Sequence, residues 1–282
     1  MFRRQTSGSI LCPSCGLLVG VNDEQCLNCG RRRPGLWGFT GPLALLRSEE
    51  GFVQFVMWTC GILYALELLA DPGGIGFDGL FSLLSPSNVA AFRLGAAGSI
   101  PVYEEHRWWT LLSAGWLHGS LPHVVLNMLA IRNVGAGMVR LYGTSRTILV
   151  YVLSCVAGFF ASSTANYFLD GLPWPITGAG LTLGASASLF GFLGAILYYG
   201  RRGGSSLIRD QAVQWIAGGL VFGFVIQGVD NWAHLGGLGG GYLAAVWLDP
   251  LKPERGDHAV AAVVLLALSL AAVALSFVTS RY

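Results

Sequence analysis

The sequence predicts an all-α protein that crosses a membrane several times, preceded by a small cysteine-rich head. Of its 282 residues, 53% are hydrophobic and only 11% are charged, whereas a soluble domain carries roughly a quarter charged residues. Seven apolar stretches follow residue 50, each close to the roughly 20 residues that span a bilayer. The net charge of +2 gives no reason to expect nucleic acid as a partner.

The apolar stretches agree with one orientation of the chain in the membrane. They cover approximately 52–70, 120–141, 147–168, 181–199, 212–229, 232–248 and 259–279. With the N-terminus inside, thirteen of the seventeen Lys and Arg residues lie on the inner side, three lie outside, and Arg132 falls within the second stretch. Because basic residues concentrate on the cytoplasmic side, we expect a cytoplasmic N-terminus and an outside C-terminus. The last stretch carries no charge and is expected to face lipid at the periphery.

Four of the six cysteines lie in the head as two Cys-x-x-Cys pairs, Cys12 with Cys15 and Cys26 with Cys29, separated by ten residues. Two such pairs can place four thiolates around one Zn(II) in a closed structural site. A segment too small to bury a core gains its fold from such a metal. The alternative is four free thiols or two disulfides in a flexible tail.

The head is expected to remain in the reducing cytosol, because no secretory signal precedes the first apolar stretch. A basic run, Arg31 to Arg33, follows the second cysteine pair. We expect a zinc-ribbon-like domain over 1–35 and a linker over 36–50. The domain is a candidate for contact with a cytosolic partner.

Four polar side chains lie within the apolar stretches at a similar depth. His123 and Asn127 are four residues apart near the start of the second stretch, so they share one helical face. Ser186 lies near the start of the fourth stretch and His234 near the start of the sixth. All three stretches run from outside to inside, which places the four groups a turn or two below the outer surface. Polar groups at this depth usually face the bundle interior and serve a function.

Small residues are expected to bring Ser186 and His234 together. They follow each of the two side chains along its helix, as Gly191 and Gly194, then Gly237 and Gly241. Such residues let membrane helices pack nearly backbone to backbone. A serine hydroxyl attacks an amide only when a base takes its proton, and a neutral imidazole is the usual base. The sequence therefore predicts Ser186 as a nucleophile and His234 as its base.

The attacked carbonyl oxygen develops negative charge, which hydrogen-bond donors must stabilise. His123, Asn127 and the backbone N–H of Ser186 are the expected donors, because they share the depth of the predicted dyad. The sequence thus predicts a complete site for acyl transfer within the membrane.

These residues resemble the rhomboid family of intramembrane serine proteases. The resemblance lies in Gly184-Ala-Ser186, in His123-x-x-x-Asn127, and in Ala233-His234-x-x-Gly237-x-x-x-Gly241, which occur in the family's order. It covers about residues 52–249. Each motif alone is weak, whereas the ordered set is specific.

The resemblance implies a six-helix core over 51–249, followed by a loop and an additional transmembrane helix over 250–282. It implies Ser186 and His234 as a dyad without an essential acid, and His123 and Asn127 in the oxyanion role. The implied substrates are other membrane proteins, cut within or beside a transmembrane helix in a bilayer, here expected to be a bacterial inner membrane. Catalysis requires no cofactor.

The sequence departs from the commonest pattern of the family near the dyad. Ala187 follows Ser186 where glycine is frequent, and Phe190 stands where a tyrosine often packs on the histidine. The Phe190 ring can still stack there, although it donates no hydrogen bond.

Other roles for the polar residues remain open at this point. Asp230, one turn before His234, could orient the imidazole, although an N-cap role for Asp230 or Asn231 is the more usual one. Ser188 is the nearest competing nucleophile, and its position two residues after Ser186 turns it to another face.

Two other classes of function compete with a protease. A catalytically inactive rhomboid-like protein would bind transmembrane helices of client proteins, and retention of both Ser186 and His234 argues against it. A transporter lacks support because no matched inverted repeats are found. A catalytic metal site at His118, His123 and His234 lacks a carboxylate or cysteine at ligand spacing.

Overall fold

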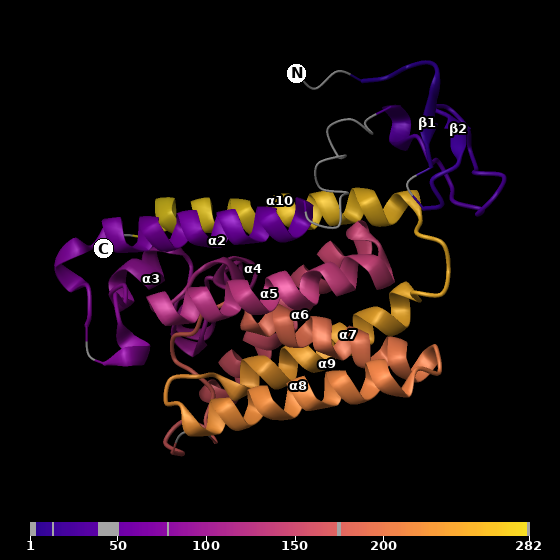
Figure 1. Cartoon of the computed structure of the whole chain (residues 1–282). Helices are drawn as coiled ribbons and strands as arrows, with labels where there is room; N and C mark the ends of the chain where they lie inside the picture. Colours follow the sequence, from indigo (N-terminus) through magenta and orange to yellow (C-terminus); the bar gives the residue numbers. More distant parts are fainter. Residues whose placement is uncertain (1–3, 13, 39–50, 78, 174–175, 281–282) are drawn as a thin grey trace.

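The computed structural model describes residues 4–12, 14–38, 51–77, 79–173 and 176–280. Its long helices run side by side as one bundle (Figure 1). They are α2 (Gly51–Ala70), α5 (Leu121–Tyr142), α6 (Thr144–Phe168), α7 (Ser186–Arg202), α8 (Ser206–Val225), α9 (Asn231–Leu248) and α10 (Gly256–Thr279). Most of the predicted linker over 36–50 lies outside the described residues. The predicted all-α membrane architecture with a small head is confirmed.

Four of these helices, α2, α5, α6 and α10, are long and apolar enough to cross a membrane, judged by length and composition. Helix α6 lies at the centre of the bundle, since 67% of its most apolar window is buried, against 33% in α2 and α10. Helix α10 accordingly occupies the periphery, where it packs on α6 and on the short helices α3 (Asn88–Leu94) and α4 (Thr110–Ser113).

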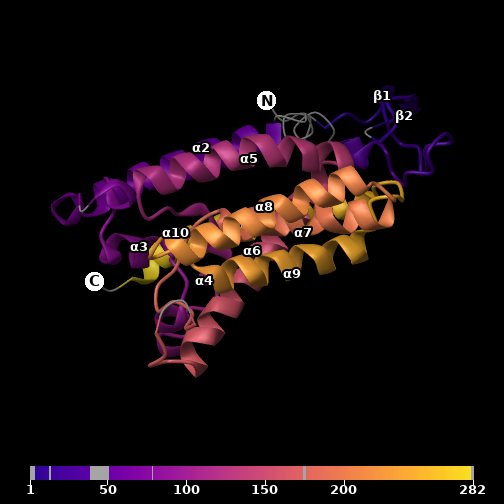
Figure 2. The ribbon, with the colours of Figure 1, turned by 60° about the horizontal axis from the view of Figure 1, so that its bottom comes forward.

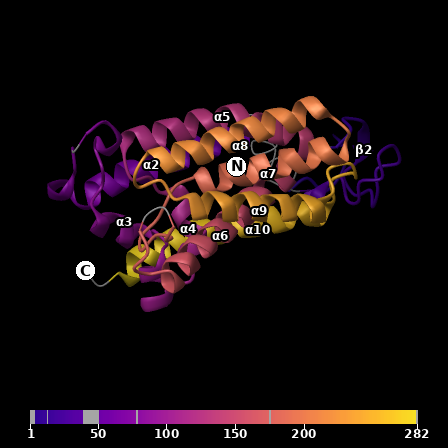
Figure 3. The same ribbon diagram turned by 90° about the horizontal axis from the view of Figure 1, so that it is seen from below.

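The head and the C-terminus lie at opposite ends of the bundle. In Figures 1, 2 and 3 the head lies at the right-hand end and the C-terminus at the left-hand end. Helices α5, α7 and α9 all begin at the end that is remote from the head. The starts of these three helices therefore share one level, as the sequence indicated.

The head contains an antiparallel hairpin of β1 (Ser9–Leu11) and β2 (Leu18–Gly20), in which Ile10 pairs with Val19. A short 3₁₀ turn, η1 (Leu36–Gly38), ends the described part of the head. The first cysteine pair lies in the loop between β1 and β2, and the second pair follows β2. Both make the same turn, since Gly16 N–H donates to the Cys12 carbonyl and Gly30 N–H to that of Cys26.

The long segment between α2 and α5 folds into short helices at the end remote from the head. These are η2 (Pro72–Gly74), η3 (Leu80–Ser82), α3 (Asn88–Leu94), η4 (Ile100–Glu104), α4 (Thr110–Ser113) and η5 (Ala114–Trp116). Arg107 fixes the segment to α10, because its guanidinium donates to the carbonyls of Phe92 and Ser276 at 3.0 and 3.1 Å. The segment thus forms an ordered cap rather than an open loop.

Helix α7 starts five residues later than the fourth apolar stretch predicts. The preceding residues are extended, with Thr182 bridged to Ala97 and Gly184 N–H donating to the Ala114 carbonyl at 2.9 Å. Gly184 has φ +131°, a backbone conformation that favours glycine and stops the helix from extending toward its N-terminus. Ser186 is consequently the first residue of α7.

Candidate active site and metal centre

The structure brings Ser186 and His234 into direct contact. Oγ of Ser186, at the start of α7, lies 3.0 Å from Nε2 of His234, in the first turn of α9. This distance fits a hydrogen bond in which the imidazole accepts the hydroxyl proton. The histidine is buried, at 5% exposure.

The two helices approach through main-chain atoms. A Cβ added at Gly241 would lie 2.1 Å from the Gly191 carbonyl oxygen, and one added at Gly237 would lie 2.1 Å from that of Ala187. A Cβ at Gly194 would lie 2.2 Å from the Leu238 carbonyl oxygen. Any side chain at these positions would force α7 and α9 apart, so the glycines set the distance between the dyad residues.

Phe190 fixes the plane of the His234 imidazole. The two rings stack with centroids 4.1 Å apart and planes 8° apart. The ring of Phe190 is in turn held against α8, where a Cβ at Gly219 would lie 2.6 Å from its Cζ atom. The imidazole can therefore rotate little about its side-chain bonds.

Asp230 caps α9 and does not orient the imidazole. Its Oδ1 accepts the backbone N–H of Ala233 at 3.0 Å, while its Oδ2 accepts the hydroxyls of Ser162 and Thr182 at 2.5 and 2.8 Å. Among the described residues, no group hydrogen-bonds Nδ1 of His234. The contact between Ser186 and His234 therefore has no acidic third member among the described residues. Sequence reasoning did not identify Ser162 and Thr182, which hold Asp230 from α6 and from the extended segment.

Hydrogen bonds assign the tautomer of His123. Gly119 N–H donates to Nδ1 at 3.3 Å, so the neutral ring carries its proton on Nε2. A Cβ at Gly184 would lie 2.7 Å from that Nε2, which places the N–H beside the Ser186 segment. Asn127 donates one amide N–H to the His123 carbonyl at 3.0 Å, and its second N–H remains for another acceptor.

All four predicted polar residues line one cavity of about 840 Å³. Helices α5, α7, α8 and α9 contribute to its wall, together with η3. Phe81 of η3 and Phe222 of α8 meet edge to face across it, with centroids 6.0 Å apart. The cavity is large enough to hold several residues of an extended peptide beside the dyad.

The competing polar residues are engaged elsewhere. Ser188 is buried and donates to the Tyr151 carbonyl at 2.8 Å. The backbone N–H of His118 donates to the buried carboxylate of Glu67 at 3.1 Å, and the His118 ring lies edge to face against His123. Within the described part of the chain, no group of histidines and carboxylates is arranged to hold a metal ion.

The four head cysteines form the group that can hold a metal ion. Their sulfur atoms all lie within 4.8 Å of one another, with Cys12 and Cys29 at 3.6 Å and Cys15 and Cys26 at 3.7 Å. Sulfurs at the corners of a tetrahedron around Zn(II) lie about 3.8 Å apart, given Zn–S bonds of about 2.3 Å. A hydrogen bond from the Leu17 backbone lowers the pKa of the Cys15 thiol to about 6, which favours the thiolate that metals bind. The donor set and its spacing fit zinc.

Comparison with known proteins points to one family. Residues 105–250, just over half of the chain, match the model of the Rhomboid domain. The chain is 34% identical over 167 residues to Rhomboid protease GluP of Bacillus subtilis (strain 168), covering 58% of this chain and 31% of that protein. It is 33% identical over 187 residues to RHOMBOID-like protein 1 of Arabidopsis thaliana, covering 62% of this chain and 43% of that protein.

A third relative, Inactive RHOMBOID-like protein 8 of Arabidopsis thaliana, is 27% identical over 165 residues, which are 55% of this chain and 42% of that protein. The chain thus spans less than half the length of these relatives. The matched region nevertheless includes α5 to α9, which supply all four polar residues around the cavity. By its domain match and its relatives, the chain belongs to the rhomboid family.

Proposed function

We propose that the protein is an intramembrane serine endopeptidase that hydrolyses peptide bonds within or next to transmembrane segments of other membrane proteins. The observation that carries this proposal is the 3.0 Å contact between Ser186 Oγ and His234 Nε2 at the wall of a cavity of about 840 Å³. Acyl transfer requires a nucleophile and a base within hydrogen-bond distance of each other, next to a cavity that can hold the substrate.

In the first half of the reaction, Ser186 Oγ attacks the scissile carbonyl carbon while His234 Nε2 takes the hydroxyl proton. The resulting imidazolium gives this proton to the leaving amine, which leaves an acyl-enzyme on Ser186. In the second half, His234 takes a proton from water, which attacks the ester and restores the serine hydroxyl. The stacked Phe190 keeps Nε2 directed at the reacting oxygen throughout.

The developing oxyanion receives donors from three sources. Nε2–H of His123 and the second amide N–H of Asn127 come from α5. The backbone N–H of Ser186 comes from the first turn of α7, where the helix dipole presents its positive end. One removed donor of this type typically costs about 100-fold to 1000-fold in rate.

Substrates reach the dyad from the bilayer, between α5 and α8. These helices form the cavity wall with Leu126 and Phe222, and Phe81 closes it from the cap. A transmembrane segment that contains glycine unwinds more easily into an extended form that such a cavity accepts, because glycine has a low helix propensity. Water enters from the end remote from the head.

The proposed orientation places the head in the cytoplasm and the C-terminus outside, in a bacterial inner membrane. Arg201 and Arg202 end α7, and Lys252 and Arg255 lie between α9 and α10, at the end of the bundle that carries the head. This clustering follows the positive-inside rule. An alkaline phosphatase fused after Tyr282 should be active in a bacterial host, and an inactive fusion would reverse the orientation.

A fluorophosphonate probe tests the proposed nucleophile. The purified protein should be labelled covalently, and Ser186→Ala should abolish the labelling because the reacting oxygen is gone. Ser188→Ala is the matched control and should retain it, since the Ser188 hydroxyl is bonded to the Tyr151 carbonyl. Labelling that survives Ser186→Ala would refute the assignment. Membrane proteomes with intact and Ser186→Ala protein would then identify clients as truncated single-pass proteins.

The alternative function, a catalytically inactive rhomboid-like protein, predicts a different result in the same assay. A protein that only binds transmembrane helices of clients would retain them without labelling or cleavage. The presence of both Ser186 and His234 in contact favours the protease.

The second part of the proposal concerns the head, in which Cys12, Cys15, Cys26 and Cys29 hold a structural Zn(II). Zinc supplies no chemistry at the dyad and stabilises the fold of the head. Elemental analysis of the intact chain should find about one zinc per molecule, and replacement of all four cysteines by serine should remove it. Absence of metal from the intact chain would overturn this assignment.

A further inference from the structure

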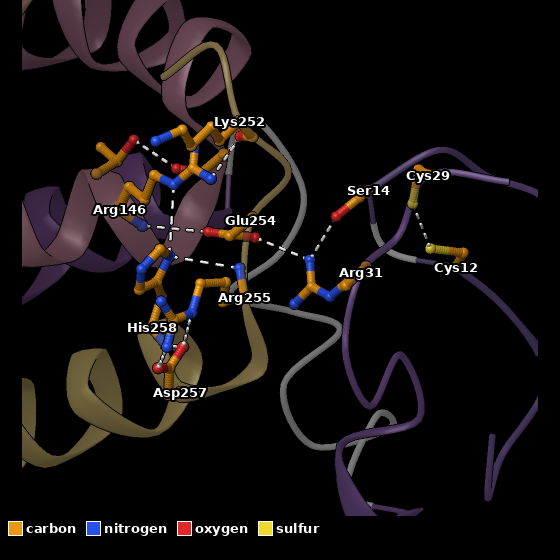
Figure 4. A network of polar contacts seen from close by, with 12 residues as sticks. Cys12, Ser14, Cys29, Arg31, Arg146, Lys252, Glu254, Arg255, Asp257 and His258 are labelled. Carbon is orange, nitrogen blue, oxygen red and sulfur yellow. Dashed lines mark hydrogen bonds and ion pairs between the residues drawn. The ribbon is translucent and has the colours of Figure 1, made fainter. Parts of the chain in front are cut away.

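One contact between the head and the bundle is made by Glu254, in the connection between α9 and α10 (Figure 4). Its Oε2 lies 3.0 Å from Nη1 of Arg31 in the head. Its Oε1 accepts the backbone N–H of Arg146, in the first turn of α6, at 3.2 Å. The same carboxylate lies against the junction of α5 and α6, where a Cβ at Gly143 would be 3.1 Å from Oε1. One side chain thus joins the head to the ends of several helices.

Both cysteine pairs hold Arg31 in place. The Arg31 carbonyl accepts the N–H of Cys26, in the second pair, at 2.9 Å. Nη1 of Arg31 donates at 2.8 Å to Oγ of Ser14, which lies between Cys12 and Cys15. The Arg31 side chain is completely buried in this position. Nη1 of Arg31 contacts both Ser14 and Glu254, so its position at Glu254 depends on how the two cysteine pairs are arranged relative to each other.

Arg146 extends the contact into the membrane bundle. Its Nη2 donates to the Lys252 carbonyl at 2.6 Å, and its Nε donates to Nδ1 of His258 at 3.4 Å (Figure 4). The start of α6 is thereby fixed to the connection that follows α9. Farther along α6, a Cβ at Gly158 would lie 2.6 Å from the Ala233 carbonyl oxygen, next to His234. Helix α6, whose first turn contacts Glu254, therefore also packs against α9, the helix of His234.

We propose that the head docks on this chain's own membrane bundle through Arg31, and that metal binding by the head holds Arg31 against Glu254. The inference rests on the proposed metal site. A bound metal fixes the two cysteine pairs relative to each other. Its removal frees Arg31 from the alignment that both pairs impose and leaves the partly buried Glu254 carboxylate without Arg31 as its ion-pair partner. The connection between α9 and α10 and the first turn of α6 then loosen.

The Arg146 amide proton reports this docking from within the bundle. In the zinc-bound protein its hydrogen exchange should be slow, because Glu254 accepts it. Glu254→Ala removes the acceptor and sets the upper limit of the exchange rate. Removal of zinc by a chelator, or Arg31→Gln in the zinc-bound protein, should each speed exchange by about tenfold toward that limit. In Arg31→Gln, zinc removal should add little, because both changes break the same contact.

Asp210→Asn is the matched control, since it removes an exposed carboxylate paired with Arg209 that does not contact the head. It should leave the exchange of Arg146 unchanged. If the intact protein contains no metal, the proposed metal site fails and the inference fails with it. Two results would overturn the docking inference and leave the metal site in place. In the first, zinc is present but its removal leaves the Arg146 amide protected from exchange. In the second, zinc removal speeds this exchange as much in Arg31→Gln as in the parent protein.

Discussion

Replacement of His234 by alanine is expected to lower the rate of substrate cleavage by about 10,000-fold or more, because no other base lies within reach of Ser186. The 3.0 Å contact with Ser186 Oγ is the only path for the hydroxyl proton among the described residues. Single-turnover cleavage of a reconstituted transmembrane substrate measures the loss. The rate constant should fall while most substrate binding is retained, since His234 is one of many residues that line the cavity.

The fold of the variant must be checked in the same experiment, because the Phe190 ring loses its stacking partner. A melting temperature within a few degrees of the parent would attribute the rate loss to chemistry. Ser188→Ala provides a matched loss of a polar side chain near the site and should retain most activity. A His234→Ala protein that cleaves at more than about a hundredth of the parent rate would refute the proposed base.

Gly241→Ala is expected to destabilise the protein by about 3 kcal/mol and to lower activity by at least about 100-fold. The added Cβ would lie 2.1 Å from the Gly191 carbonyl oxygen, and a backbone atom cannot rotate away as a side chain can. Helices α7 and α9 must separate, which lengthens the contact between Ser186 and His234. Reversible unfolding in detergent micelles and cleavage kinetics measure the two effects.

Gly239→Ala on the same helix is the matched control. Nothing lies within 4 Å of a Cβ at this position, so the methyl group meets open space and the helix gains the usual preference for alanine. Its stability should change by less than about 1 kcal/mol. Equal effects of the two substitutions would show that close packing of α7 on α9 does not govern the dyad.

The sequence predicted the architecture well because membrane helices are determined by length and apolar composition. The common depth of His123, Ser186 and His234 followed from the alternating direction of the helices, and the structure places all three on one cavity. The starts of helices were predicted less well. Ser186 as the first residue of α7 depends on the backbone of Gly184 and on pairing with Ala97, a contact across 85 residues of sequence that no local pattern reveals.

Several partners around the site also lay beyond sequence reasoning. Ser162 and Thr182 share the Asp230 carboxylate, yet each resembles any polar residue of a membrane helix or loop until the chain is folded. The same holds for Glu254, which no sequence motif singled out. Its contacts with Arg31 and Arg146 join segments more than 100 residues apart, and such distant pairs leave no spacing that can be read along the chain.

The glycine contacts between α7 and α9 have a consequence for motion. Because glycines bring the two backbones into close contact, neither helix can slide along the other without a collision, which resists relative movement of Ser186 and His234. Helix α8, by contrast, buries only Ala212 and Gly223 among its described residues. If the proposed function holds, we expect a substrate segment to enter by outward movement of α8, while α7 and α9 keep their positions.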